Sequence, residues 1–107
     1  MESIVPQAKR AGSILPQSPA LLRIAQRLIW WMSPEESLNE RPLFLAQVMT
    51  LGTWDDVKAV RGELGEEVLR ETLRNAPPGI FDVRSWHYWH RRFGKEPIPP
   101  LPKREIP

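Results

Sequence analysis

Proline and glycine residues divide this chain into intervals that are too short for any long helix. The sequence contains 12 prolines. Proline lacks the N–H that a helix interior needs, and glycine commonly ends helices. The intervals that separate Pro19, Pro34, Pro42 and Gly52 leave room for roughly two to four helical turns each. The sequence therefore predicts an assembly of short helices.

The residues that begin these intervals are typical of helix starts. Ser18 and Ser33 each precede a proline, which pairs a capping side chain with the residue best suited to the first helical position. Thr53 and Asp56 have the spacing of a capping box, and Asp82 precedes the last apolar stripe. We expect helices over residues 19–32, for about one turn after Pro34, and over residues 42–51, 54–61, 66–75 and 83–93.

The apolar pattern has a helical period throughout. Leu21, Ala25, Leu28 and Met32 repeat at three- and four-residue steps, and residues 43–51 are almost all apolar, which is typical of a central helix. No period-two alternation indicates a strand. The predicted fold class is all-α: a compact bundle of five to six short helices with proline-rich N- and C-terminal arms. We expect a flexible arm over residues 1–17, a helical domain over 18–94 and an extended tail over 95–107.

Composition excludes several classes of function. The chain has no cysteine, which removes disulfides, thiolate metal sites and cysteine nucleophiles. No apolar run approaches the roughly 20 residues that span a bilayer, and no stretch has the order of a signal peptide, so we expect a cytoplasmic protein without a membrane span. Charge is uneven: net +3 over residues 1–33 (four basic, one acidic), net −4 over 34–76 (five basic, nine acidic) and net +3 over 77–107 (six basic, three acidic).

The tryptophans admit two interpretations. In the first, Trp30-Trp31 and Trp86/Trp89 form one aromatic core between the first and last helices, because small domains depend on large aromatics for buried area. However, adjacent helical residues point about 100° apart, so Trp30 and Trp31 cannot both face the interior. The second interpretation is a docking surface for a protein partner. Its anchors are Trp30, Trp31, Trp86, Tyr88, Arg91 and Arg92.

Residues 84–93 also favour nucleic acid as an alternative partner. Basic side chains interleaved with aromatic ones are typical of a surface that binds phosphates and stacks bases. The residues that would make these contacts are Arg84, His87, Arg91, Arg92 and Lys95. A helix-turn-helix around Gly62 and Gly65 is a weaker signal, since its second helix would begin with Glu66-Glu67, which repels phosphate.

Nothing in the sequence indicates an enzyme, a metal site or a cofactor. His87 and His90 share a helix face, but a zinc site needs two further ligands and the chain has no third histidine. No glycine-rich loop is followed by the lysine that cradles phosphates. In the tail, Pro99, Pro102 and Arg104 have a P-x-x-P-x-R spacing. That tail is either a strap that binds a partner or a disordered tether.

Three strings of this sequence resemble a small bacterial family of helical proteins. They lie at residues 44–56, 76–81 and 84–90, and the resemblance covers roughly residues 28–94. Members of that family are often encoded just upstream of AbiEii-type nucleotidyltransferase toxins. The resemblance implies an antitoxin that docks and neutralises such a toxin. No binding residue is assigned by it, and the winged helix of the larger antitoxins of such operons is missing from this pattern.

We therefore carry three functional hypotheses forward. The first is a non-enzymatic protein-binding module, the antitoxin of a toxin–antitoxin pair whose acidic middle segment would cover a basic substrate groove. The second is a nucleic-acid-binding regulator of its own operon that uses the basic aromatic last helix. The third is a self-associating structural protein, that is, a homo-oligomer.

Overall fold

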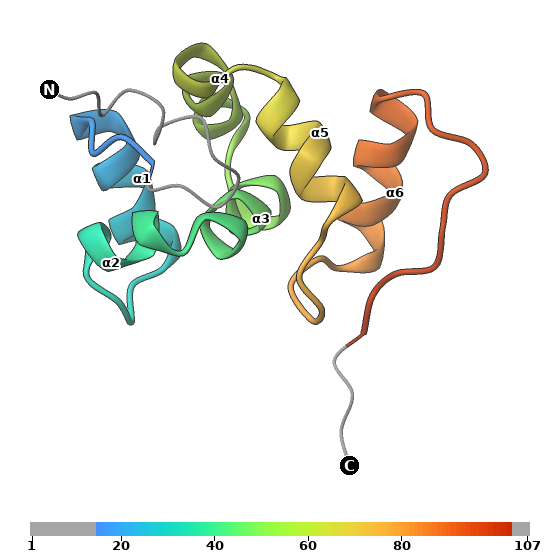
Figure 1. The fold of residues 1–107 in the computed structure, drawn as a ribbon, viewed down its shortest axis with the longest axis horizontal. Coiled ribbons are helices and arrows are strands. Elements are labelled where there is room, and N and C mark those ends of the chain that lie inside the picture. The colour runs from blue at the N-terminus through green and yellow to red at the C-terminus, as the bar shows by residue number, and fades with distance from the viewer. Residues whose placement is uncertain (1–14, 104–107) are drawn as a thin grey trace, which may run out of the picture.

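The part of the chain described by the computed structural model, residues 15–103, is all-helical and contains no strand, which confirms the predicted fold class. Its helices are α1 (Pro19–Leu28), α2 (Pro34–Asn39), α3 (Arg41–Leu51), α4 (Trp54–Leu64), α5 (Glu67–Arg74) and α6 (Val83–Arg92) (Figure 1). No helix among these residues is long and apolar enough to cross a bilayer.

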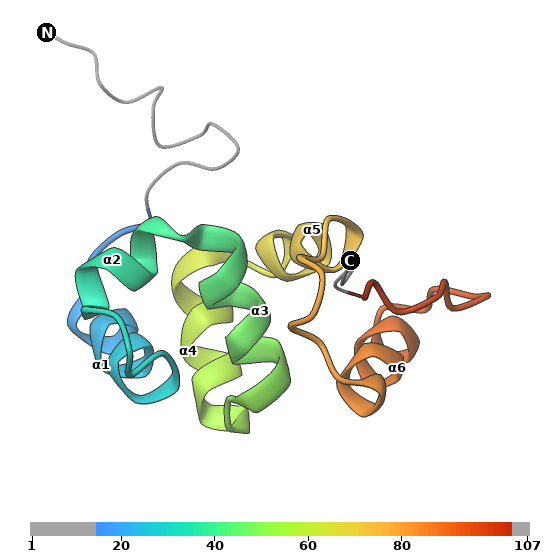
Figure 2. The ribbon, with the colours of Figure 1, turned by 90° about the horizontal axis from the view of Figure 1, so that it is seen from below.

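Helix α3 is the centre of the molecule. It packs against each of the other five helices. Helices α1 and α2 lie on one side of it and α5 and α6 on the other, which gives an elongated body of 45 × 34 × 28 Å (Figures 1 and 2). Phe44, Leu45, Ala46 and Val48 are all at most 1% exposed. Residues 44–49, the middle of this almost entirely apolar helix, are buried on every side.

The helix starts follow the predicted caps. The Ser18 hydroxyl accepts from the Leu21 N–H at 3.1 Å, and Asp82 Oδ1 accepts from the Ser85 N–H at 2.7 Å. Thr53 caps α4 in a reciprocal pair with an aspartate three residues later. A second capping box, which was not predicted from the sequence, joins Ser33 and Glu36. Each cap satisfies an N–H group that a helix leaves unpaired.

Two helix ends differ from the prediction. α1 ends at Leu28 rather than at residue 32, because Ile29 leaves the helical conformation with φ −128° and ψ 67°. α4 continues through Gly62 to Leu64 and is capped by Gly65, whose φ of 90° favours glycine. A solvent-facing glycine costs a helix about 1 kcal/mol and does not by itself stop it.

The predicted boundary at residue 94 is not where packing stops. Residues 95–103, here called the proline strap, run back along the domain (Figure 1). Ile98 and Leu101 pack against the core, and the Pro99 carbonyl accepts from the Trp86 indole N–H at 2.8 Å. Leu15, expected in the N-terminal arm, is also buried. Residues 1–14 of that arm and Arg104 lie outside the described residues.

Candidate binding surfaces

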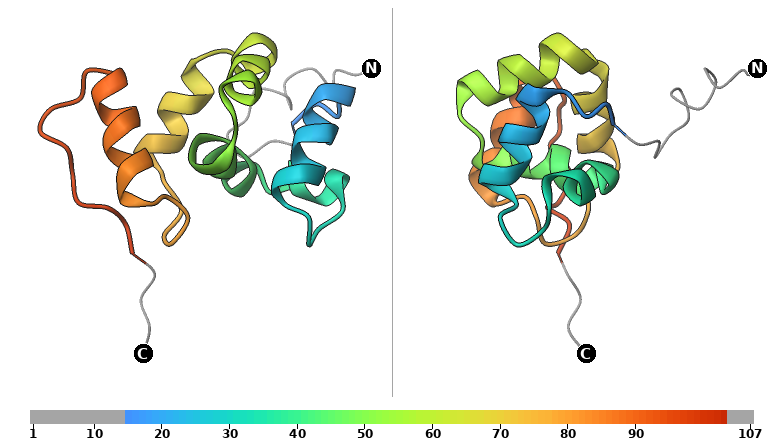
Figure 3. Two further views of the ribbon diagram at one scale, coloured as in Figure 1. Left: turned by 180° about the vertical axis from the view of Figure 1, so that it is seen from behind. Right: turned by 90° about the vertical axis from the view of Figure 1, so that its left-hand side faces the viewer.

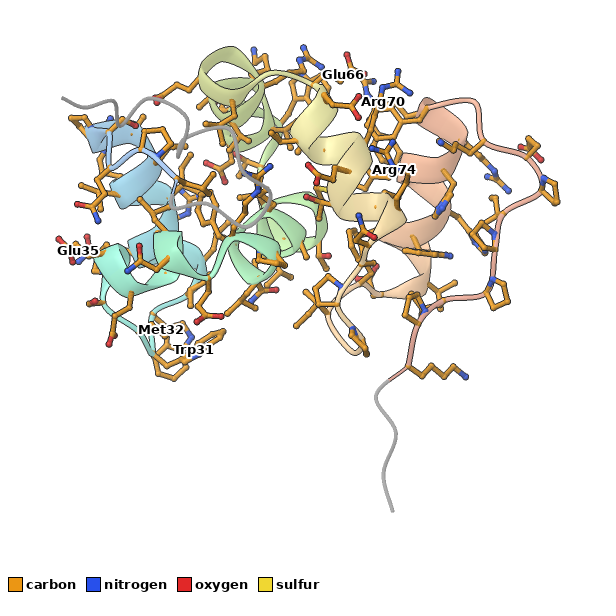
Figure 4. All side chains as sticks on the ribbon, viewed as in Figure 1. Trp31, Met32, Glu35, Glu66, Arg70 and Arg74 are labelled. Carbon is orange, nitrogen blue, oxygen red and sulfur yellow. The ribbon has the colours of Figure 1, made fainter. Side chains whose placement is uncertain are left out.

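The connection between α1 and α2 exposes two adjacent tryptophans. Ile29 is fully buried, Met32 is half-buried, and the Met32 N–H donates to the Ile29 carbonyl at 3.3 Å. In this turn Ile29 and Met32 point inward, and Trp30 and Trp31 between them point outward. Trp30 is 77% exposed and Trp31 54% exposed, and their rings meet edge to face with centroids 5.6 Å apart. We call this pair the tryptophan corner; Figure 4 labels Trp31 at that end of the molecule.

A single aromatic core that contains all four of these tryptophans is therefore wrong. Trp86 and Trp89 are each 3% exposed and belong to the core, whereas the tryptophan corner faces solvent. Trp89 packs against Phe93 with centroids 5.5 Å apart, and Phe81 packs against Trp86 at the same separation. Trp86, one of the predicted partner-binding residues, is thus a core side chain in this structure and does not reach the surface.

A basic surface lies on the solvent side of α6. Five side chains line a shallow depression of about 680 Å³ there: Arg84, His87, Tyr88, Arg91 and Arg92. All five positions are linked by steps of three or four residues, which brings them to one side of the helix. Tyr88 is 46% exposed. Within residues 15–103, none of the three arginines forms an ion pair.

Trp54, at the start of α4, extends the basic surface. The Arg92 guanidinium lies 4.9 Å from the centre of the Trp54 ring, and that of Arg61 lies 5.5 Å from it. α6 and the start of α4 lie along the same edge of the molecule in Figure 2, and Figure 3 (left) shows that side from the front. A guanidinium stacked on an aromatic ring keeps its N–H edge free for a phosphate or carboxylate. Trp54 was not among the site residues predicted from the sequence.

Two residues of the last helical segment lie elsewhere. Lys95, predicted to contact nucleic acid, lines a separate cavity between α5, α6 and the proline strap. His90, predicted to share a helix face with His87, is 4% exposed, and its Nδ1 lies 2.8 Å from the Trp86 carbonyl oxygen. His87 is exposed on the basic surface. The structure thus brings four of the five predicted nucleic-acid residues together and separates Lys95 from them.

The acidic middle segment is largely neutralised by its own neighbourhood. Five of its nine carboxylates form ion pairs within residues 15–103: Asp55 with Lys58, Asp56 with Arg27, Glu66 with Arg70, Glu67 with Arg74, and Glu71 with Arg41. Four of the nine carboxylates are left without an ion pair within residues 15–103.

The exposed face of α5 shows this compensation most clearly (Figure 4). Arg74 donates to Glu67 at 2.8 Å, and this hydrogen bond lowers the pKa of Glu67 from its ordinary value. Arg70 lies 3.4 Å from Glu66 and stacks on the Phe93 ring at 4.4 Å. A helix whose arginines are already paired is poorly suited to phosphates, so α5 does not favour the helix-turn-helix interpretation.

Comparisons of the chain with protein-family models, with curated proteins and with solved structures found no match. The resemblance to partners of nucleotidyltransferase toxins therefore stays a prediction. Within residues 15–103, no group of three or more His, Cys, Asp or Glu side chains is placed to hold a metal ion. The tryptophan corner and the basic surface are the candidate sites on which a function can be argued.

Proposed function

We propose that this protein is a non-enzymatic binding module that docks a protein partner through the tryptophan corner. The observation that carries the proposal is the exposure of Trp30 and Trp31, at 77% and 54%, on a turn where neither ring contributes to the core. Tryptophan is enriched among the residues that dominate protein–protein binding energy, and its large flat surface is unfavourable in water.

The size of the exposed surface is sufficient for an anchor. A tryptophan presents up to about 250 Å², so the two exposed fractions amount to roughly 330 Å². At about 25 cal/mol per Å², complete burial would contribute at most about 8 kcal/mol. Ordering and desolvation reduce that figure, and an anchor of this kind usually accounts for about 2–4 kcal/mol on truncation.

The surroundings of the corner indicate the chemistry of its partner. Glu35, which is labelled in Figure 4, and Glu36 are exposed in the first turn of α2, the helix that follows the tryptophan corner. An apolar pocket bordered by basic side chains would complement both features. The nucleotidyltransferase-like toxin implied by the sequence resemblance, with its basic substrate groove, is the first partner to test; that resemblance is its only support.

Co-expression provides the test. The chain and the nucleotidyltransferase-like protein encoded beside its gene are expected to elute together at low salt. Trp30→Ala/Trp31→Ala should lower the affinity by about 30-fold or more, which corresponds to 2 kcal/mol. Leu51→Ala is the matched control, since Leu51 is 58% exposed and lies outside the corner. Separate elution of the two native proteins, or equal losses in both variants, would contradict the proposal.

The basic surface favours a second candidate function, which is nucleic-acid binding. The observation that favours it is that three arginines, Arg84, Arg91 and Arg92, have no carboxylate partner within residues 15–103. The exposed rings of Tyr88 and Trp54 lie on the same surface. Arginines bind phosphates and aromatic rings stack bases, so a single strand fits this arrangement. Because arginine–phosphate contacts release counterions, affinity should fall as the salt concentration rises.

A matched pair of variants tests this candidate. Arg91→Ala/Arg92→Ala should weaken binding of a single-stranded oligonucleotide at about 50 mM salt and reduce the slope of log K against log salt by about 0.7 for each phosphate that the variant no longer neutralises. Arg70→Ala/Arg74→Ala removes the same formal charge from ion-paired positions on α5 and should have a smaller effect. Absence of binding by the native chain at this salt concentration would remove the candidate.

A further inference from the structure

The proline strap lies along a groove between α5 and α6. Its carbonyl groups accept from two donors of the domain: the Trp86 indole N–H bonds to Pro99 at 2.8 Å, and the Gly79 backbone N–H bonds to Pro102 at 3.4 Å. Ile98 and Leu101, three residues apart as in a polyproline turn, pack on the core. An indole that donates to a carbonyl of an extended proline segment is a usual way in which aromatic grooves recognise such peptides.

The strap does not fill the groove. A cavity of about 540 Å³ remains between the prolines of the strap, among them Pro97 and Pro100, and a floor that includes Leu73, Trp86 and His90. Binding pockets for small ligands have volumes of about 300–1,000 Å³, so this space is large enough for a bulky side chain.

One polar atom of the floor also lacks a partner. His90 Nδ1 must donate its hydrogen, because the Trp86 oxygen 2.8 Å away can only accept. In the neutral ring, Nε2 is then an acceptor. No hydrogen bond from residues 15–103 reaches it, so it is left to the solvent of the cavity that His90 lines. Prolines at positions 99, 100 and 102 of the strap have no N–H to offer.

We propose that the groove between α5 and α6 is a binding site for an extended proline-rich peptide of another protein, and that the proline strap occupies it until that peptide displaces it. The peptide carries a large apolar residue at the position that Pro100 takes in the strap. Its side chain fills the cavity, and its backbone N–H is available to His90 Nε2. This site is separate from the tryptophan corner and does not depend on the docking proposed there.

Competition with the strap determines the affinity that such a peptide needs. A segment on a short tether has an effective concentration of about 1 mM, so a free peptide identical to the strap displaces it only weakly. Burial of one phenylalanine side chain strengthens binding by roughly 10- to 100-fold. That gain is enough to give displacement at micromolar to submillimolar peptide.

Synthetic peptides and the full chain labelled with ¹⁵N provide the test. One peptide has the native sequence of residues 95–103, and the other carries Pro100→Phe. The Pro100→Phe peptide is expected to shift the Trp86 indole N–H signal and to bind at least about tenfold tighter than the native peptide. The Trp89 indole N–H donates to the Met49 carbonyl at 2.8 Å and does not contact the strap through this bond. Its NMR signal should therefore not shift.

Two variants of the chain establish that strap and peptide compete. Ile98→Ser/Leu101→Ser weakens the strap and should tighten peptide binding by about tenfold. Pro100→Phe within the chain lets the strap fill its own cavity, so it should raise the melting temperature and weaken peptide binding by about tenfold or more. No Trp86 shift at about 10 mM peptide, or equal affinity for the native and Pro100→Phe chains, would overturn the proposal.

Discussion

Replacing Asp56 with alanine removes an acceptor on which both the start of α4 and a contact with α1 depend. Asp56 Oδ2 accepts from the Thr53 backbone N–H at 2.8 Å and from the Arg27 guanidinium of α1, and the Asp56 side chain is 7% exposed. The preceding residue, Asp55, has the same charge at the same helix end, but it is 91% exposed and faces Lys58 at 3.6 Å. The two aspartates therefore differ in burial and in their partners. Both lie in the first turn of α4, so both interact with the helix dipole in the same way.

The expected magnitude follows from these contacts. Loss of a capping box costs about 1 kcal/mol. The Arg27 ion pair adds at most about 1 kcal/mol, because the Arg27 side chain is 53% exposed and solvent screens the interaction. Asp56→Ala should therefore lower the free energy of unfolding by about 2 kcal/mol. Asp55→Ala loses an exposed pair with Lys58, which contributes about 0.5 kcal/mol.

Urea unfolding followed by far-ultraviolet circular dichroism measures both values, and equal slopes in urea show that the denatured states are comparable. In thermal melts, a 2 kcal/mol loss in a domain of this size lowers the melting temperature by roughly 8–16 °C. Arg27→Ala should reproduce only the ion-pair part of the loss. Equal destabilisation by Asp55→Ala and Asp56→Ala would refute the reasoning, since burial and the contact with α1 would then have no effect.

Three further predictions concern stability. Gly52→Ala places a Cβ atom 2.6 Å from the Val48 carbonyl oxygen and should cost about 1–3 kcal/mol in urea unfolding. Trp89→Phe deprives the buried Met49 carbonyl of its indole donor and should cost about 1–3 kcal/mol by the same assay. Glu67, whose pKa is lowered mainly by a hydrogen bond from Arg74, stabilises the fold above its unfolded pKa and loses that effect as pH falls through the folded pKa. Glu67→Gln should therefore reduce the dependence of melting temperature on pH in the acid range, and added salt should diminish the difference.

The sequence predicts the helix starts well because a cap is a local interaction. Ser18, Ser33, Thr53 and Asp82 each bond to an N–H three residues away, so the pattern and the contact lie within one turn. The same locality explains why α3 could be placed at the centre from residues 43–51 alone. A helix that is almost entirely apolar has no face that prefers water.

Contacts between distant segments were not predictable in this way. The stacking of Arg92 on Trp54 joins residues from α6 and α4. The apolar spacing that predicts each helix does not indicate which residues of two helices will meet. The proline strap presents the same difficulty, because Ile98 and Leu101 have too few apolar neighbours in sequence to indicate a buried face. Its packing depends on the groove that α5 and α6 create after they fold.

Indole hydrogen bonding separates the tryptophans that hold the fold from those that remain available. Trp86 and Trp89 each donate their N–H to a backbone carbonyl, and both are buried. Trp30, Trp31 and Trp54 are exposed, and within residues 15–103 their indole N–H groups form no hydrogen bond.

Burial of an indole requires a partner for its N–H, and the interior of this small domain supplies such a carbonyl for Trp86 and for Trp89. An exposed indole can leave its N–H to water until another molecule covers the ring and accepts the hydrogen. The tryptophan corner and Trp54 keep both a flat apolar surface and an unused donor, and these are the two features that a partner's pocket can satisfy at once.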